Sequence, residues 1–134
     1  MTKRILTIIL GLFISTQSFS QTWTYVGKNA KSELYFIKKH SETYGSTKVW
    51  IKHISKITEY YKRGKTYIVN GYTLTLYETD CTDRKLNLRT VNTYKSDGTF
   101  VDTYSKEEYQ NDWTEVVPDS IGEMFLEKAC EILQ

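Results

Sequence analysis

The sequence predicts an α+β fold, in which an antiparallel β-sheet of about six strands is joined by one C-terminal helix. Eleven Tyr and three Trp against a single Pro favour strands, because aromatic side chains suit a pleated, half-buried surface. The end of the chain instead repeats apolar residues at helical spacing. The 40% hydrophobic and 25% charged fractions are typical of a folded protein and argue against disorder.

Alternation of apolar and polar residues places the strands, and clusters of turn residues separate them. The predicted strands cover residues 23–26, 33–38, 47–54, 72–79, 86–94 and 99–104, and a short extended stretch covers 113–117. Asp97 and Gly98 predict a tight hairpin turn, since Gly tolerates the positive φ that such turns require. Pro118 disfavours helix at its predecessor and ends the last extended stretch.

The segment 55–71 fits three structures: a long loop, a short helix, or a hairpin that turns near Arg63 and Gly64. It mixes aromatic and basic residues, a composition that is enriched at protein interfaces. The candidate binding patch consists of Tyr60, Tyr61, Arg63, Lys65 and Tyr67. The simpler interpretation is a hydrated loop whose tyrosines pack on their own stem.

The C-terminal helix has a predicted start at Ser120. Ser120 and Glu123 have the spacing of a capping box, in which each side chain accepts a hydrogen bond from a free backbone N–H at the helix start. The apolar face of the helix comprises Phe125, Leu126, Ala129, Cys130 and Leu133. This face directs Cys130 toward the sheet.

Residues 1–20 have the three parts of a secretory signal peptide: a basic start, the apolar run 5–14 and a small-residue end with cleavage before Gln21. The alternative, a membrane anchor, is too short, because a spanning helix needs about 20 apolar residues. No Cys follows the apolar run, so we expect no lipid anchor. The sequence thus predicts one exported domain, 21–134, in a periplasm, outside the cell or on its surface, with no later membrane span.

Removal of Lys3 and Arg4 with the signal would leave 16 basic and 16 acidic residues. A neutral domain has no overall field to attract nucleic acid, so no nucleic-acid partner is expected.

Two cysteines, Cys81 and Cys130, remain in the predicted exported chain. In an oxidising compartment the simplest expectation is a disulfide between them. A reactive thiol is the alternative, although neither Cys has a His nearby in sequence. A metal site with His40 and His53 is a further alternative, but the close pairs of ligands typical of zinc are missing. The prediction is therefore a bridge that docks the helix on the sheet, with no metal or cofactor.

The sequence contains no phosphate-binding glycine loop, no Gly-x-Ser-x-Gly elbow and no His-Glu-x-x-His. His53 lies in an apolar strand and is expected to be a packed or surface residue rather than a base. Glu107 and Glu108 lie in the polar segment 105–112, which is expected to be a surface loop. We therefore expect the protein not to be an enzyme.

Several features, taken in order along the chain, resemble the surface-adhesin protein E family of small exported bacterial domains. They are Trp23, the Tyr-rich early strand, Val49-Trp50, Asp80-Cys81, Tyr94 with the Asp97-Gly98 turn, Trp113, Pro118, Ser120 and Cys130. The resemblance implies an antiparallel sheet with a helix, a Cys81–Cys130 bridge, and adhesion to host proteins. An exported module that binds host or envelope proteins is therefore the first functional hypothesis. A periplasmic module that binds a small ligand or acts as an inhibitor, through an open sheet face or a helix–sheet crevice, is the alternative.

Overall fold

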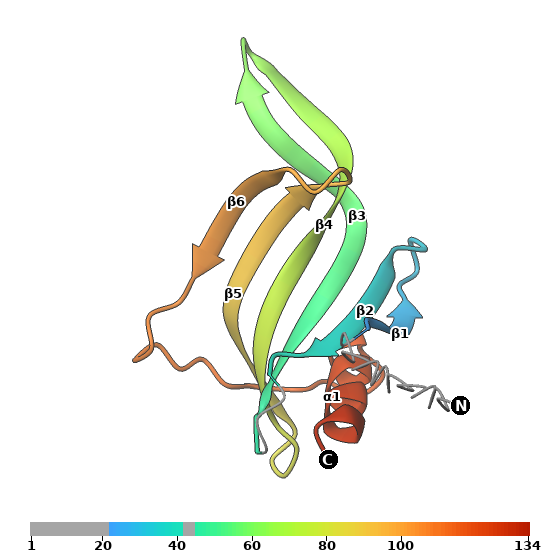
Figure 1. Cartoon of the computed structure of the whole chain (residues 1–134), viewed down its shortest axis with the longest axis vertical. Coiled ribbons are helices and arrows are strands. Elements are labelled where there is room, and N and C mark those ends of the chain that lie inside the picture. The colour runs from blue at the N-terminus through green and yellow to red at the C-terminus, as the bar shows by residue number, and fades with distance from the viewer. Residues whose placement is uncertain (1–21, 42–44) are drawn as a thin grey trace, which may run out of the picture.

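The computed structural model describes residues 22–41 and 45–134, with the backbone alone given for residues 58–62. The predicted signal peptide, 1–20, and the cleavage site before Gln21 lie outside the described residues. Within them the fold is predominantly β, with one sheet and one helix (Figure 1). That helix is neither long enough nor apolar enough to cross a membrane.

Six strands lie side by side in chain order, each antiparallel to the next (Figure 1). They are β1 (Thr24–Lys28), β2 (Leu34–Lys39), β3 (Lys48–Lys62), β4 (Lys65–Asp80), β5 (Lys85–Lys95) and β6 (Phe100–Ser105). A seventh strand, β7 (Thr114–Glu115), pairs with the start of β5, whose far half pairs with β6. The predicted antiparallel sheet is confirmed, whereas the extended stretch expected at 113–117 contributes only two strand residues.

The helix α1 (Ile121–Ile132) packs its apolar side on the lower part of the sheet. As predicted, the Ser120 hydroxyl accepts a hydrogen bond from the backbone N–H of Glu123 at 3.2 Å. The return bond differs: the Glu123 carboxylate accepts from the N–H of Asp119 at 3.1 Å, because the N–H of Ser120 already donates to the carbonyl of Val117. The shared core consists of Tyr35, Ile37, Val49, Ile51, Leu86, Phe125, Leu126 and Ala129.

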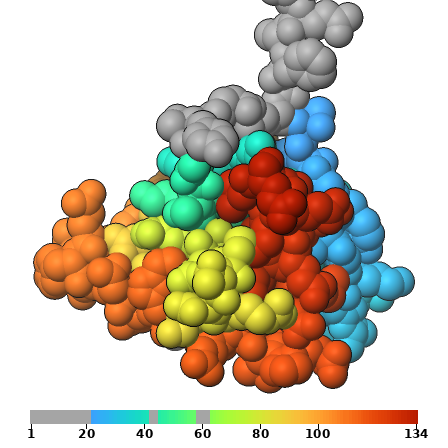
Figure 2. All heavy atoms as spheres, turned by 90° about the horizontal axis from the view of Figure 1, so that it is seen from below, coloured from blue at the N-terminus to red at the C-terminus, as the bar shows by residue number. Residues whose placement is uncertain are grey.

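A disulfide joins Cys81, in the turn after β4, to Cys130 on α1. Figure 2 shows this turn, in yellow, lying against the red helix. The predicted pairing and its role in docking the helix are confirmed. The fold nonetheless contains more strand and less helix than the α+β expectation suggested, since α1 is the one helix of the described residues.

The segment 55–71, for which three structures were possible, forms the hairpin. Its two strands run on without a break from the predicted strands, so β3 continues to Lys62 and β4 begins at Lys65. The strand ends predicted at residues 54 and 72 were therefore wrong, and so was the loop interpretation of this segment. The reason is that the two strands pair with each other to the tip of the hairpin, with one register shift between Thr58 and Tyr60. Backbone pairing of this kind does not require apolar side chains.

Candidate functional site

The outer half of the β3–β4 hairpin projects beyond the other strands (Figure 1). Pairing of β3 with β2 ends at Ile54, and pairing of β4 with β5 begins at Gly71. Residues 55–70 therefore form a two-stranded ribbon, here called the arm. Its outer edges have no strand partner among the described residues. Such edges can present backbone donors and acceptors to another chain, although the Asn70 carbonyl already accepts from Ser96.

The arm ends in a two-residue turn at Arg63 and Gly64, with Lys62 and Lys65 paired across it. Both turn residues have positive φ, 50° for Arg63 and 74° for Gly64, as the hairpin turns that match strand twist require. An arginine in this conformation is uncommon. The turn places its charged side chain at the tip of the arm, where it is exposed.

The predicted patch is distributed along the tip of the arm. Arg63, Lys65 and Tyr67 are all exposed. Tyr60 and Tyr61 pair in register with Tyr67 and Thr66, but their side chains lie outside the described residues. The backbone register thus brings all five positions of the patch to one end of the molecule.

The base of the arm is closely packed around Gly71. A β-carbon at this position would lie against the backbone oxygen of Tyr94 and 2.8 Å from Cδ1 of Ile57. Ile57 is buried, and the N–H of Ser96 donates to the carbonyl of Asn70 at 3.1 Å. These contacts hold the ribbon to the sheet, which matters because an isolated two-stranded hairpin is only marginally stable in water.

A hollow of about 630 Å³ lies beside this base, between the β1–β2 turn and the arm. It is lined by Lys31, Ser32, Glu33, Ile54, Ser55, Lys56, Ile68 and Asn70. Ile68 has 65% of its surface exposed, which is high for a large apolar side chain. The hollow therefore combines exposed aliphatic surface with two lysines and the Glu33 carboxylate.

A polar cluster that includes Glu33 supports the β1–β2 side of this hollow. Nε2 of His53 lies 2.8 Å from the Glu33 carboxylate, and the Asn29 amide donates to the same carboxylate at 2.8 Å. Nε2 must carry the proton, because an ionised carboxylate only accepts. The Asn29 bond first, and the His53 bond second, lower the pKa of Glu33. Burial raises the pKa of Tyr35, whose ring stacks on His53 at 4.4 Å.

The cluster gives His53 an orienting carboxylate, which is one requirement of a general base. Among the described residues, however, no hydroxyl or thiol hydrogen-bonds to its imidazole. No group of three or more His, Cys, Asp or Glu within residues 22–41 and 45–134 is arranged to hold a metal ion. The arrangement therefore orders the β2–β3 pair, and the stacking of His53 on Tyr35 fits the expectation of a packed or surface residue.

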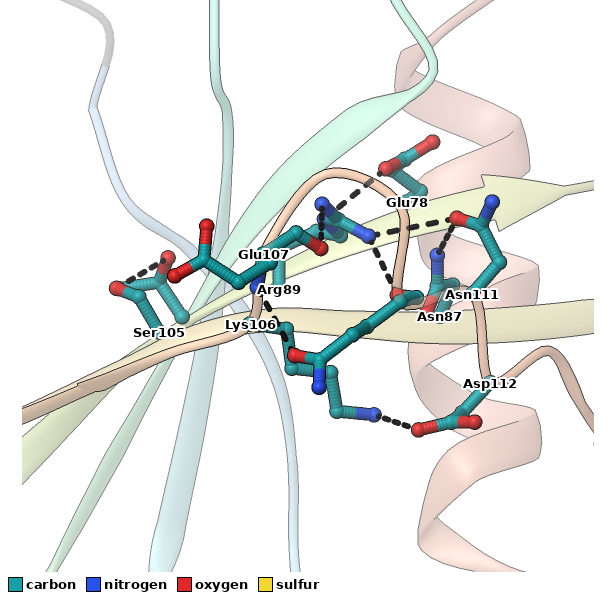
Figure 3. A network of polar contacts seen from close by, with 10 residues as sticks. Glu78, Asn87, Arg89, Ser105, Lys106, Glu107, Asn111 and Asp112 are labelled. Carbon is teal, nitrogen blue, oxygen red and sulfur yellow. Dashed lines mark hydrogen bonds and ion pairs between the residues drawn. The ribbon is translucent and has the colours of Figure 1, made fainter.

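A second polar network, which the sequence pattern did not indicate, surrounds Arg89 on β5 (Figure 3). Arg89 is the extra residue of a bulge, since the adjacent Leu76 and Tyr77 of β4 pair with Thr90 and Leu88. The guanidinium contacts the Glu78 carboxylate at 3.3 Å, the carbonyls of Glu107 at 3.1 Å and Gln110 at 3.0 Å, and Oδ1 of Asn111 at 3.4 Å. The exposed loop 106–112 is therefore fixed to the sheet from its inner side.

A crevice of about 370 Å³ separates the start of α1 from β5 and β7. Tyr77, Leu86 and Leu88 line its sheet side, and Lys106 and Asp112 form an ion pair at 2.8 Å beside it. This is the helix–sheet crevice that a small ligand would use under the alternative hypothesis.

The features that carry the resemblance have structural roles. Cys81 and Cys130 form the bridge, Asp97 and Gly98 form the β5–β6 turn, and Ser120 caps α1. A sequence profile described as surface-adhesin protein E matches residues 23–131. The chain belongs to the surface-adhesin protein E family. No curated protein and no solved structure shows a significant match.

The match to the surface-adhesin protein E family runs through the arm as well as the framework, since residues 55–70 lie within it. The family profile also ends at the last turns of α1, next to the bridge that holds this helix.

Proposed function

We propose that the protein is a non-enzymatic, exported binding domain of the adhesin type, which attaches to a host or envelope protein through its arm. The family description as a surface adhesin supports export to the cell surface or beyond it. The observation that carries the proposal is the arm itself, a ribbon that extends past the sheet and exposes Arg63, Lys65, Tyr67 and Ile68.

The exposed side chains at the arm favour a protein partner. Tyr and Arg are enriched at the cores of protein interfaces, where they combine apolar contact with hydrogen bonding. The hollow at the base adds the aliphatic side chains of Ile54 and Ile68, with Lys56 between them along the ribbon. A partner with an apolar anchor and a nearby carboxylate would fit this combination.

The backbone of the arm favours the same class of partner. Its unpaired edges can accept an added strand, in which main-chain hydrogen bonds supply affinity and side chains supply specificity. This mode needs an extended polypeptide and excludes a small ligand. The arm therefore offers two ways to hold a protein, through its edges and through its tip.

The test is attachment of the oxidised, exported protein to immobilised extracellular-matrix proteins and to isolated bacterial envelopes. Arg63→Asn with Lys65→Ser removes two of the tip charges and leaves Lys62, while Asn keeps the positive φ of the turn. Ile68→Ser removes an aliphatic side chain that is 65% exposed beside the hollow. We expect both variants to lose about tenfold or more in affinity, as hot-spot residues do. The matched control is Lys128→Ser on the far side of α1.

Unchanged attachment of both arm variants would remove the arm from the proposal. Attachment that weakens equally in Lys128→Ser would show a nonspecific charge effect. Loss of attachment in the arm variants alone, with thermal unfolding unchanged, is the supporting result.

A further inference from the structure

One face of the sheet is not covered by α1. Side chains alternate between faces along each strand, so the buried Ile37 and Ile51 mark the helix side, and their neighbours Phe36, Lys38, Trp50 and Lys52 mark the other. We call this other side the open face. Its large side chains are half-buried among one another, and none of the four just named is among the buried core residues.

A row of rings crosses the open face from strand to strand. Lys52 lies 5.9 Å from the ring of Trp23 and 4.5 Å from the ring of Tyr72. Tyr72 stacks on Tyr94 at 5.2 Å, and Tyr94 meets Phe100 edge-on at 5.9 Å. The row therefore reaches from the start of β1 to β6, with one ammonium group built into it.

The charge of this face is positive. β2 and the described part of β3 carry Lys38, Lys48, Lys52 and Lys56 on the open face and no carboxylate. None of these lysines forms an ion pair with a described residue. Glu78, on the same face of β4, is held by Arg89 at 3.3 Å. An anionic partner would thus meet four lysines that have no ion-pair partner among the described residues, even though the exported chain is predicted to be neutral overall.

The orientation of the rings restricts the kind of anion. Lys52 lies over the Tyr72 ring at 4.5 Å, and Tyr94 stacks on the same ring at an interplanar angle of 17°. Trp23 has both Lys38 and Lys52 near its ring. Of the rings in the row, Tyr72 therefore offers little free flat face on which a nucleobase or a sugar could stack. Ring edges carry positive charge density and attract oxygens, so they suit the same anionic groups as the lysines.

We propose that the open face is a second binding surface, which takes an acidic amphipathic polypeptide segment. Its carboxylates would lie against Lys38, Lys52 and the ring edges. Its apolar side chains would lie against Leu74 and Leu76, which are partly exposed on the same face of β4. These aliphatic positions favour a polypeptide over a glycan, because carboxylates or sulfates alone would leave them uncovered. This surface is distinct from the tip of the arm.

The probe is a 14-residue helical peptide of Leu and Glu with its leucines on one side. Two matched peptides replace Glu by Lys or Leu by Ser. Amide and indole NMR shifts of the oxidised, exported protein locate each peptide. We expect the Leu–Glu peptide alone to shift the open-face amides and the Trp23 indole. Lys52→Glu and Lys38→Glu should each weaken its binding about tenfold or more, because they put like charges together.

The control is Lys128→Glu, which makes the same charge change on α1 and should bind the peptide as the native protein does. Two results would overturn the proposal in favour of general polyanion binding. One is equal binding of the acidic peptide in which Ser replaces Leu. The other is binding of heparin or single-stranded DNA with the same NMR shifts. Binding of the Leu–Lys peptide, or shifts confined to residues 55–70, would also overturn it. Variants of the arm tip should leave this binding unchanged, so the two surfaces are tested separately.

Discussion

The guanidinium of Arg89 lies 3.3 Å from the carboxylate of Glu78 on the neighbouring strand and also holds three oxygen atoms of the loop 106–112. The arginine is itself buried. It therefore connects β4, β5 and a loop that has no other regular structure. Lys106 adds a backbone bond at the same place, its N–H donating to the carbonyl of Arg89 at 2.9 Å.

Replacement of Arg89 by Met should destabilise the protein by about 3 kcal/mol, the lower end of the range for removing one partner of a buried ion pair. The carboxylate of Glu78 and two backbone carbonyls would lose their donor. Arg89→Lys should lose less, because an ammonium keeps the charge but cannot reach all four acceptors. Urea unfolding measures the loss, and limited proteolysis should cut within residues 106–112.

Lys128→Ala is the control for this prediction, since it removes the half-buried partner of the exposed Glu131 and should change stability by about 0.5 kcal/mol or less. If Arg89→Met unfolds at the same urea concentration as the native protein and shows no new cleavage in the loop, the network contributes no stability.

The same network shows which parts of the structure local sequence patterns could predict. The Ser120 cap, the Asp97–Gly98 turn and the helix face depend on residues close in sequence, and all three were predicted. Asn87 and Arg89 occupy alternate polar positions, a pattern typical of a solvent-facing side. They are buried because the loop 106–112 folds over them, at 0% exposure for Asn87. That contact joins residues about twenty positions apart, which no local period encodes.

The candidate site likewise has some features that local sequence predicts and others that depend on pairing between distant residues. The turn at Arg63 and Gly64 could be proposed from Gly64, whereas the length of the arm depends on where β2 and β5 stop pairing. Predicting the row of rings on the open face likewise requires the pairing register of five segments of the chain. Its members, such as Trp23 and Tyr94, looked like ordinary strand aromatics in the sequence.

Gly71→Ala should destabilise the protein by about 1–3 kcal/mol, the usual cost of overpacking. The added carbon would meet the backbone oxygen of Tyr94, which cannot move without breaking the β4–β5 pairing. Gly27→Ala is a matched control, because its new carbon would meet only the flexible end of Met124. Thermal unfolding of both variants should rank Gly71→Ala clearly below Gly27→Ala. The reverse order would contradict the close packing inferred at the base of the arm.

Removal of the disulfide by Cys81→Ser with Cys130→Ser should cost about 4 kcal/mol, because the bridge closes a loop with a sequence separation of 49. The loss should be seen as a lower urea midpoint, and α1 should become the first element to exchange its amide protons. Reduction of the native protein with dithiothreitol should give the same result. Equal protection of α1 with and without the bridge would mean that Phe125, Leu126 and Ala129 hold the helix by packing alone.

Stability should fall in acid partly through Glu33. Hydrogen bonds from Asn29 and His53 lower the pKa of this carboxylate in the folded state. Its contribution is therefore present above the unfolded pKa, about 4.3, and is lost as the pH falls through the lower folded pKa. Glu33→Gln should unfold at a lower temperature than the native protein at pH 7, and the difference should shrink as the pH drops below about 4. Thermal unfolding from pH 7 to pH 2.5 measures this, with Glu127→Gln, an exposed position on α1, as the control. If the difference in unfolding temperature between Glu33→Gln and the native protein stays constant over this range, the cluster does not act by stabilising the ionised carboxylate.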